Sequence, residues 1–426
     1  MTQLSEALEG NITPAMEHVA QQEGIRPEQV RQGVAEGTLV IPCNKRHTGM
    51  KPTGIGAGLR TKVSASVGLH GPGAHVAAEL EKIKAAVDAG TDAIMDLSVS
   101  GDLDAMRRQI LAATPTPVGT LPFYEAIAEA GQKYASPLHM TADELFCVIE
   151  RQASDGVDFL ALHFATTMEV MDRAKKEGRI DPLVSYGGSH LMGWMIHNQK
   201  ENPLYEKYDR VLEIARRYDV TLSLADGMRP GCVADSLDGA QVHELVILGE
   251  LVRRAREAGV QIMVEGPGHV PLHHVKATML LQKRLCNGAP YFVLGTLATD
   301  IAPGYDHITS AIGGALAGMA GADFICNVTP AEHLGLPTEQ DVKDGIMAAR
   351  IAAHAADMAR GNRQALSRDL QMARARVALN MNQQASLSLD SEKLKESCGV
   401  GHENDCCAVC GPQCAADVAA RYFGIA

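Results

Sequence analysis

Short apolar runs recur along the middle of the chain, from about residue 61 to residue 336, at intervals of about 25 to 40 residues. Each run is followed by a helical stretch or by a loop marked with glycine and proline. Several runs are apolar on both faces, which is typical of strands buried in a parallel sheet. This rhythm predicts repeated βα units. The candidate strands begin near Lys62, Ala93, Val118, Phe159, Leu183, Thr221, Gln261, Tyr291 and Ala322.

These nine candidates exceed by one the eight strands that close a (β/α)8 barrel. We therefore expect an α/β fold, with a (β/α)8 TIM barrel over residues 61–336 and one candidate outside the closed sheet. An open doubly wound sheet is the alternative. Polar residues at or just past the strands' C-terminal ends favour the barrel, because that end is its catalytic face. They are Asp96, Tyr124, His163, Ser185, Asp226, Glu265 and His269.

Helical periodicity replaces the strand rhythm at both ends of the chain. Residues 12–23 and 27–36 predict two helices, followed by a short extended segment, so residues 1–60 should form a small N-terminal cap. Beyond the barrel, residues 338–360 and 363–383 are rich in Ala, Met, Arg and Leu and predict two helices, which would form a helical hairpin domain over residues 337–397. Residues 398–426 are too short and polar to form a core of their own.

Composition and charge narrow the class of protein. A chain of 426 residues with 46% hydrophobic content can bury one large core or two modest ones. The formal net charge of -12, without a sustained Lys/Arg block, argues against a nucleic-acid partner. The chain does not open with a positively charged, then apolar, signal sequence, and it has no apolar stretch long enough to span a bilayer. We expect a cytoplasmic protein.

Half of the ten cysteines lie in the last 29 residues. In a reducing compartment, metal ligation explains such a cluster better than disulfides do. Cys407, Cys410 and Cys414 place three thiols within eight residues, and three thiolates leave one iron of a 4Fe-4S cubane open. An open iron is what a radical S-adenosylmethionine enzyme requires. From spacing alone, a structural zinc knuckle completed by Cys406 or His402 is the alternative.

Four strings of residues are far more specific than their individual motifs. They are SLADGMRPG at 223–231, VEGPGHVP at 264–271, TDIAPGYDHITSAIGG at 299–314 and TPAEHL at 329–334. Together they closely resemble the phosphomethylpyrimidine synthase family, over roughly residues 36–426. The resemblance implies a radical enzyme that uses S-adenosyl-L-methionine and acts on 5-aminoimidazole ribotide, with a 4Fe-4S cluster on Cys407, Cys410 and Cys414. The family pattern usually has four residues between the last two cysteines, and this chain has three.

The same resemblance places a mononuclear metal, usually zinc, on His269 and His333. A borderline-soft divalent ion accepts two imidazoles and keeps open positions for other ligands. Taken alone, His269 also fits a loop cap and His333 a helix entry. His307 lies just ahead of an expected helix start, where side chains more often satisfy backbone donors, and it is left out of the metal site.

The resemblance also carries over a substrate-contacting set, position by position. Glu265, Asp226 and His163 are expected to be catalytic. Arg229 and the backbone at Gly187 suit a phosphate, whereas Asp226 and Glu265 suit hydroxyl or amine donors. Core packing is the alternative for Met95, and a surface ion pair is the alternative for Asp226 with Arg229. The set is Ser66, Met95, Tyr124, His163, Ser185, Tyr186, Gly187, Asp226, Gly227, Met228, Arg229, Glu265 and Phe292.

Three of these positions depart from the pyrimidine synthase pattern. Ser66 replaces an asparagine, Tyr186 an arginine and Phe292 a tyrosine, and such losses change the hydrogen bonding of one pocket. The departures favour resemblance to a paralogous group, the 5-hydroxybenzimidazole synthases, which turn the same ribotide into a benzimidazole for anaerobic cobamide (vitamin B12) assembly. Phosphomethylpyrimidine synthesis is the alternative. A zinc-stabilised scaffold without catalysis is a third hypothesis, opposed by the intact histidines and cysteines. We further expect a homodimer and an electron donor that the sequence does not identify.

Overall fold

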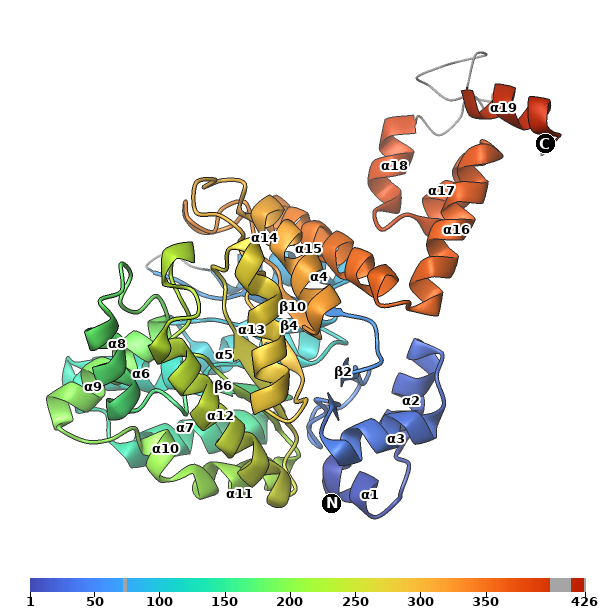
Figure 1. The fold of residues 1–426 in the computed structure, drawn as a ribbon. Coiled ribbons are helices and arrows are strands. Elements are labelled where there is room, and N and C mark those ends of the chain that lie inside the picture. The colour runs from blue at the N-terminus through green and yellow to red at the C-terminus, as the bar shows by residue number, and fades with distance from the viewer. Residues whose placement is uncertain (72–74, 399–414, 425–426) are drawn as a thin grey trace. The chain divides into compact units, whose positions relative to one another are not determined.

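A computed structural model describes residues 1–71, 75–398 and 415–424 of the chain (Figure 1). The chain divides into two compact units, Met1–Ala356 and Asp357–Ala426, and helix α15 (Glu339–Ala359) spans the boundary. The finer four-part division expected from the sequence stays a prediction. Within the described residues, no helix combines the length and the apolar character needed to cross a membrane.

Eight parallel strands close into a barrel in the first unit, in the order β10-β3-β4-β5-β6-β7-β8-β9. The ring is completed where β10 pairs with β3, with Cys326 opposite Ser64. The predicted (β/α)8 barrel is confirmed. The strands are β3 (Lys62–Val67), β4 (Ala93–Asp96), β5 (Val118–Thr120), β6 (Phe159–Leu162), β7 (Thr221–Leu224), β8 (Ile262–Gly266), β9 (Tyr291–Val293) and β10 (Phe324–Cys326).

The surplus strand candidate is the one near Leu183. This segment is the loop that enters helix α9 (Tyr186–Asn198), and Ser185 caps the helix by accepting a hydrogen bond from the backbone N–H of Gly188 at 3.2 Å. Val184 is exposed, whereas the barrel strands are buried. A short apolar run before a polar cap is compatible with a strand or with the loop that leads into a helix. In the folded chain this run is the loop before α9.

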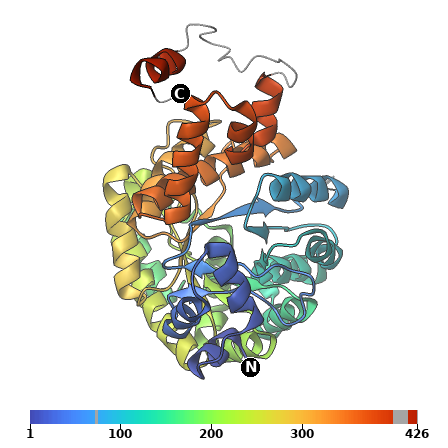
Figure 2. The same ribbon diagram turned by 90° about the vertical axis from the view of Figure 1, so that its right-hand side faces the viewer.

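Helices surround the barrel on its outer side (Figures 1 and 2). Leu160 and Leu162 of β6 belong to the same outer apolar cluster as Phe146 and Ile149 of α7. Burial on both faces is why the strands read as nearly continuous apolar runs. The surrounding helices are α4 (Val76–Asp88), α5 (Leu103–Ala113), α6 (Pro122–Tyr134), α7 (Ala142–Asp155), α8 (Met168–Glu177), α9, α10 (Pro203–Glu206), α11 (Tyr208–Tyr218), α12 (Gly239–Glu257), α13 (Leu272–Leu285), α14 (Asp306–Ala320) and α15.

Aromatic side chains fill the inside of the barrel. The rings of Phe292 and Phe324 stack with centroids 4.1 Å apart, and Phe159 meets Phe324 at 6.4 Å. A Cβ at Gly119 would lie 2.1 Å from the ring of Phe159, so only glycine fits there. This packed interior leaves only the two ends of the barrel for a binding site.

The N-terminal segment closes the end of the barrel where the strands begin. The backbone N–H of Ile41 donates to Gln261 at 2.7 Å, that of Asn44 donates to Asp158 at 2.9 Å, and Lys62 pairs with Glu23 at 2.8 Å. A ligand must therefore enter at the strands' C-terminal end. The segment comprises α1 (Gln3–Leu8), α2 (Pro14–Glu23), α3 (Pro27–Glu36), β1 (Leu39–Val40) and β2 (Ile55–Gly56).

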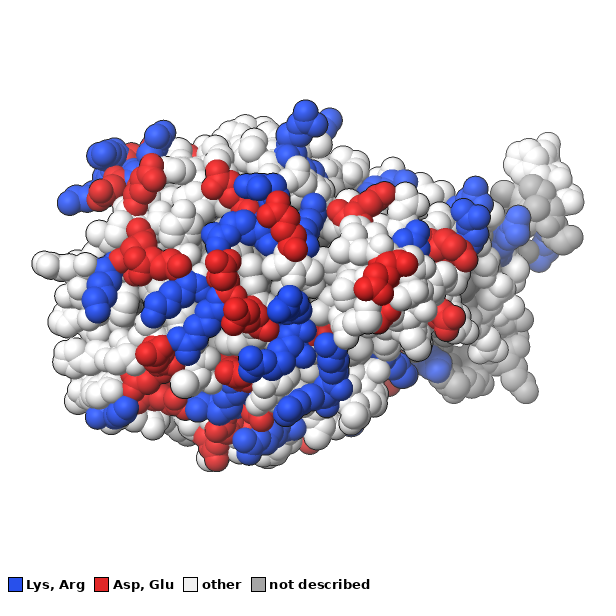
Figure 3. Space-filling model, turned by 90° about the horizontal axis from the view of Figure 1, so that it is seen from below, with Lys and Arg blue, Asp and Glu red and all other residues white. Residues whose placement is uncertain are grey.

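Charged side chains of both signs are mixed on the face shown in Figure 3. Several exposed side chains form pairs between helices, such as Arg210 with Asp143 and Arg254 with Asp209. Exposed pairs of this kind contribute at most about 1 kcal/mol each. Such pairs therefore add little to the stability of the fold, and they keep the outer faces of the helices polar.

The second unit is helical in the part that the structure describes. Asn362 caps α16 (Arg363–Val377), and the helix ends where Leu379 adopts a positive φ of 52°. The single helix expected over residues 363–383 is therefore interrupted, and α17 (Met381–Leu387), α18 (Ser391–Cys398) and α19 (Ala415–Phe423) follow. The expected cluster ligands Cys407, Cys410 and Cys414 lie outside the described residues.

Candidate active site

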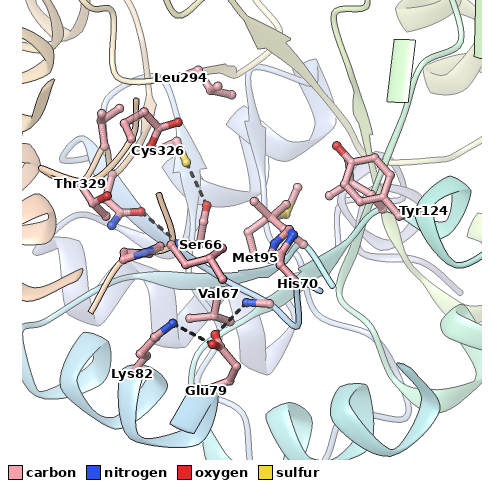
Figure 4. Close-up of a pocket in the computed structure, with 18 of the residues that line it drawn as sticks. Ser66, Val67, His70, Glu79, Lys82, Met95, Tyr124, Leu294, Cys326 and Thr329 are labelled. Atoms are coloured by element: carbon pink, nitrogen blue, oxygen red, sulfur yellow. Dashed lines mark hydrogen bonds and ion pairs between the residues drawn. The ribbon is translucent and has the colours of Figure 1, made fainter. Parts of the chain in front are cut away.

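A cavity of about 350 Å³ lies at the C-terminal end of the barrel (Figure 4). This volume is within the range of small-molecule sites. Six of the thirteen residues expected to contact substrate line it, from strands β3, β4, β8 and β9, from the first turn of helix α6 and from the loop after β7. They are Ser66, Met95, Tyr124, Arg229, Glu265 and Phe292.

The other seven expected contacts lie beside the cavity rather than on its wall, behind Tyr124 and Arg229. The ring of Tyr186 meets Tyr124 edge to face at 4.9 Å. His163 shares a hydrogen bond of 2.8 Å with the Ser185 hydroxyl. A Cβ at Gly187 would lie 2.3 Å from the imidazole of His163, so glycine is required for this approach. The seven are His163, Ser185, Tyr186, Gly187, Asp226, Gly227 and Met228.

Asp226 lies two residues after strand β7, and its carboxylate is buried. Its nearest cation is Arg229 at 3.7 Å, and neither carboxylate oxygen has a hydrogen-bond partner among the described residues. Burial, only partly offset by Arg229, raises the pKa of Asp226 to about 6. A buried carboxylate without hydrogen bonds is unfavourable, and its two oxygens are enclosed beside the cavity rather than open to it.

Glu244 and Arg179, which were not predicted from the sequence, hold the loop that carries Asp226. Glu244, on α12, accepts hydrogen bonds from the backbone N–H groups of Gly227 at 3.0 Å and Met228 at 2.8 Å. Arg179 donates to the carbonyl oxygen of Met228 at 2.7 Å. Glu244 could have been identified from the sequence, because it is an acidic residue on the apolar face of an amphipathic helix, next to the buried Leu245. No pattern in the sequence marks Arg179 in this way.

His163 carries no charge at neutral pH. Burial, followed by the positive field of Arg229, lowers the pKa of the His163 imidazole to about 3. The ring can accept or donate one hydrogen bond, as it does with Ser185, but it does not supply a cation to the site. Its expected catalytic role is therefore limited to hydrogen bonding or to neutral-base chemistry.

Glu265 projects from β8 and lines the cavity, where it accepts a hydrogen bond from the Ser223 hydroxyl at 2.7 Å. Burial raises the pKa of the Glu265 carboxyl to about 7, and the negative field of Asp226 adds to the rise. Glu265 is therefore poised between its acid and its base form near neutral pH, which suits a residue that moves a proton.

The stability of the protein should reveal this shift. Between pH 4.5 and about 7, the folded state keeps a proton on Glu265 that the unfolded state releases, so the free energy of unfolding falls as pH rises. Glu265→Gln removes this contribution. The free energy of unfolding of the variant, minus that of the wild type, should therefore rise by about 3 kcal/mol between about pH 4.5 and about pH 8. Chemical denaturation at several pH values measures it, and a difference that does not depend on pH would contradict the assignment.

His269 and His333 come together beyond the strand ends, with ring centroids 5.3 Å apart. The Nδ1 atom of His269 is hydrogen-bonded to Asp300 at 2.8 Å, and that of His333 to Asp306 at 2.8 Å. A carboxylate that holds Nδ1–H leaves the Nε2 lone pair for a metal. The two histidines therefore fit a borderline-soft divalent ion such as zinc.

The aspartates were not predicted, although both lie in the string at 299–314. Each also accepts a backbone N–H, Asp300 from Val233 at 2.9 Å and Asp306 from Gly304 at 3.0 Å. The described residues contain no group of three or more His, Cys, Asp and Glu side chains placed to hold a metal. Any further ligand must come from water, substrate or cofactor, or from residues outside that range. His307, expected ahead of a helix, lies inside the first turn of α14.

Comparison with known proteins gives matches over the whole length. The model of the radical SAM ThiC family matches residues 2–421. The 5-hydroxybenzimidazole synthase BzaB of Moorella thermoacetica is 61% identical over 425 residues, covering 100% of both chains. The phosphomethylpyrimidine synthase of the same organism is 58% identical over 426 residues, covering 100% of this chain and 99% of its own. With such matches from end to end, the chain belongs to the radical SAM ThiC family.

Proposed function

We propose that this enzyme converts 5-aminoimidazole ribotide into 5-hydroxybenzimidazole, the precursor of a lower ligand of cobamides made anaerobically. As a radical SAM enzyme it uses S-adenosylmethionine and an iron–sulfur cluster. One observation carries the choice of product. Ser66 and Phe292, two of the three positions that depart from the pyrimidine synthase pattern, line the cavity, and the third, Tyr186, packs against Tyr124 on its wall.

Overall identity does not separate the two activities. Moorella thermoacetica has both a 5-hydroxybenzimidazole synthase and a phosphomethylpyrimidine synthase, which are 61% and 58% identical to this chain. The difference is too small to assign a product, because a few pocket residues can redirect a branching reaction while the rest of the chain diverges freely. The residues that line the cavity therefore support the proposal better than the order of overall sequence identities does.

Ser66 and Phe292 make the cavity wall less polar than the asparagine and the tyrosine of the pyrimidine synthase pattern would. The Ser66 hydroxyl lies 3.3 Å from the sulfur of Cys326, and Phe292 stacks on Phe324. Tyr186 is 42% exposed and supplies no cation. A fragmented intermediate would meet fewer hydrogen bonds here than in a pocket with a carboxamide, a guanidinium and a phenol at these positions.

The remaining residues divide the work of binding. Arg229 suits the phosphate, together with the backbone N–H groups at the start of α9. Glu265 would hold or release a proton at its carboxylate. When bound, the cluster and S-adenosylmethionine supply hydrogen-atom abstraction by a carbon radical. A zinc ion on His269 and His333 would orient a charged ligand.

The product of the wild-type enzyme tests the proposal. Anaerobically reconstituted enzyme, incubated with 5-aminoimidazole ribotide, S-adenosylmethionine and a reductant, should release 5-hydroxybenzimidazole, with little hydroxymethylpyrimidine phosphate. Tyr186→Arg should lower benzimidazole formation about tenfold or more, because one charged hydrogen bond shifts a branching ratio by that much. Ile196→Arg adds the same charge to an exposed position of the same helix and should change little. Mass spectrometry that finds chiefly the pyrimidine phosphate would reassign the enzyme.

Three further properties stay predictions from the sequence. They are the homodimer, the cytoplasmic location and the separate electron donor that must reduce the cluster. None of them is needed for the choice between the two products.

A further inference from the structure

His70 follows strand β3 and was not among the expected site residues. The chain stays extended past the end of the strand. The backbone N–H of Leu97 donates to the carbonyl oxygen of Val67 at 2.8 Å, and that of Val99 donates to the carbonyl oxygen of Leu69 at 3.0 Å. These bonds continue the parallel pairing of β3 with β4, so the strand geometry extends up to His70.

The extended geometry decides where the His70 ring points. Successive side chains of an extended segment point to opposite faces. Leu69 belongs to the apolar cluster between the barrel and helices α4 and α5, whereas Ser66 lines the cavity. His70 is on the same face as Ser66 and lines the cavity itself. In Figure 4 its ring lies on the side of Met95.

The imidazole of His70 is open to the cavity. The side chain is partly exposed, and its ring nitrogens are not enclosed as the oxygens of Asp226 are. Neither nitrogen has a hydrogen-bond partner among the described residues. A neutral imidazole offers one acceptor and one donor, so both stay available to a ligand in the cavity.

Glu79 and Lys82, the charged residues of α4 next to His70, leave the imidazole neutral. The Lys82 ammonium pairs with one carboxylate oxygen of Glu79 at 2.7 Å, and the other oxygen accepts the backbone N–H of Gly68 at 3.0 Å. The negative charge of Glu79 is thus already compensated, and burial of the ring lowers the pKa of His70. At neutral pH the ring therefore keeps an unprotonated nitrogen that can accept a hydrogen bond.

The barrel order indicates which part of a ligand this acceptor would meet. Strand β3, which precedes His70, and strand β7, which precedes Arg229, are separated by three strands in either direction around the ring. They therefore face each other across the barrel mouth, and both residues line the cavity. A ribotide whose phosphate binds at Arg229 directs its other end, the imidazole ring, toward the wall formed by Ser66, Met95 and His70.

We propose that His70 is a specificity-determining residue whose unprotonated ring nitrogen accepts a hydrogen bond from the exocyclic amino group of the aminoimidazole. The proposal rests on the proposed function, because it takes the ribotide as the ligand, and it holds for either product. One ring nitrogen of the ribotide carries the ribose and the other carries no hydrogen, so the amino group is the N–H donor of this ring. A site built to accept that hydrogen bond discriminates against a ring without the amino group.

Ligand binding tests this contact without turnover. We would titrate the purified full chain with 5-aminoimidazole ribotide, and separately with the same imidazole ribotide without the amino group. His70→Phe keeps a planar ring but removes the acceptor, so the Kd for the aminoimidazole ribotide should rise about tenfold. The Kd for the ribotide without the amino group should stay within about twofold.

A matched control lies nearby in the sequence. His75 is exposed, its side chain makes no capping hydrogen bond to α4, and it does not line the cavity. His75→Phe should therefore leave both Kd values within about twofold. His70→Leu also removes the acceptor but is smaller. It is measured in parallel, with thermal unfolding, and decides the matter if the phenylalanine variant does not fold.

Each other outcome overturns the proposal in a distinct way. An unchanged Kd for the aminoimidazole ribotide in a folded His70 variant means that the ligand does not use this acceptor, and it leaves the proposed function intact. Equal losses for both ribotides place the contact on another part of the ligand. A wild-type protein that binds neither ribotide removes the proposed function and this inference together.

Discussion

Replacing Cys410 with alanine should abolish product formation, because the loss of one of three thiolates removes the cluster. Wild-type protein reconstituted anaerobically should hold about four irons per chain and show the broad visible absorbance of a 4Fe-4S cluster. The variant should lose most of the iron and absorbance, and turnover should fall below detection. The barrel belongs to the other compact unit, so its cooperative unfolding should be unchanged. Iron analysis, visible spectroscopy and thermal unfolding measure the three effects.

A matched control is available within the barrel unit. Cys147, on α7, is a free and exposed cysteine, and Cys147→Ala should keep both iron and activity. Tight zinc binding by the wild-type tail, without iron uptake, would instead support the zinc knuckle that spacing alone leaves open. The cluster assignment rests on the sequence and the family, since Cys407, Cys410 and Cys414 lie outside the described residues.

The second large effect should come from the histidine pair. His269→Ala and His333→Ala should each lose one bound divalent ion, because a single imidazole cannot hold a metal that two hold together. Activity should fall with the metal if the ion orients a ligand in the cavity. Metal content after dialysis, measured by elemental analysis, tests this. His197→Ala removes an exposed imidazole of α9 and should leave the content unchanged.

The aspartates behind the histidines provide a graded version of the same test. Asp300→Asn and Asp306→Asn remove the carboxylates that hold Nδ1 of His269 and His333. Such supporting residues typically change metal affinity by about 10- to 100-fold. We therefore expect weakened metal binding rather than loss. If both histidine variants kept the metal, the pair would be excluded as its site.

The barrel could be predicted because its signal is local. A strand buried on both faces must be apolar over several consecutive residues, and a helix that covers it must repeat its apolar positions every three to four residues. Those constraints are visible without knowing any contact. The error at Leu183 has the same cause, since a short apolar run before a polar helix cap satisfies the local rule for a strand.

The cavity residues on the strand ends could be placed in advance for a related reason. Closing the barrel brings the C-terminal ends of all its strands to one face, so Ser66, Met95 and Glu265 had to lie near one another once the strands were known. The choice of His269 and His333 as metal ligands came from the family resemblance. The sequence did not show that Tyr186 and Asp226 would lie beside the cavity, because that depends on how loops fold back over the strand ends.

Apolar periodicity and long shared strings are carried by consecutive residues, so the barrel, the helices around it, the family and most of the candidate chemistry can be predicted from the sequence. Which polar groups are paired, and which are not, becomes visible only in the folded chain. Glu244 and Arg179 hold one loop, Asp300 holds His269, and the Asp226 carboxylate is left without a hydrogen bond among the described residues. Each of these depends on hydrogen bonds between residues far apart in the chain, and a bond of about 3 Å is set by the packing of whole elements rather than by any local pattern.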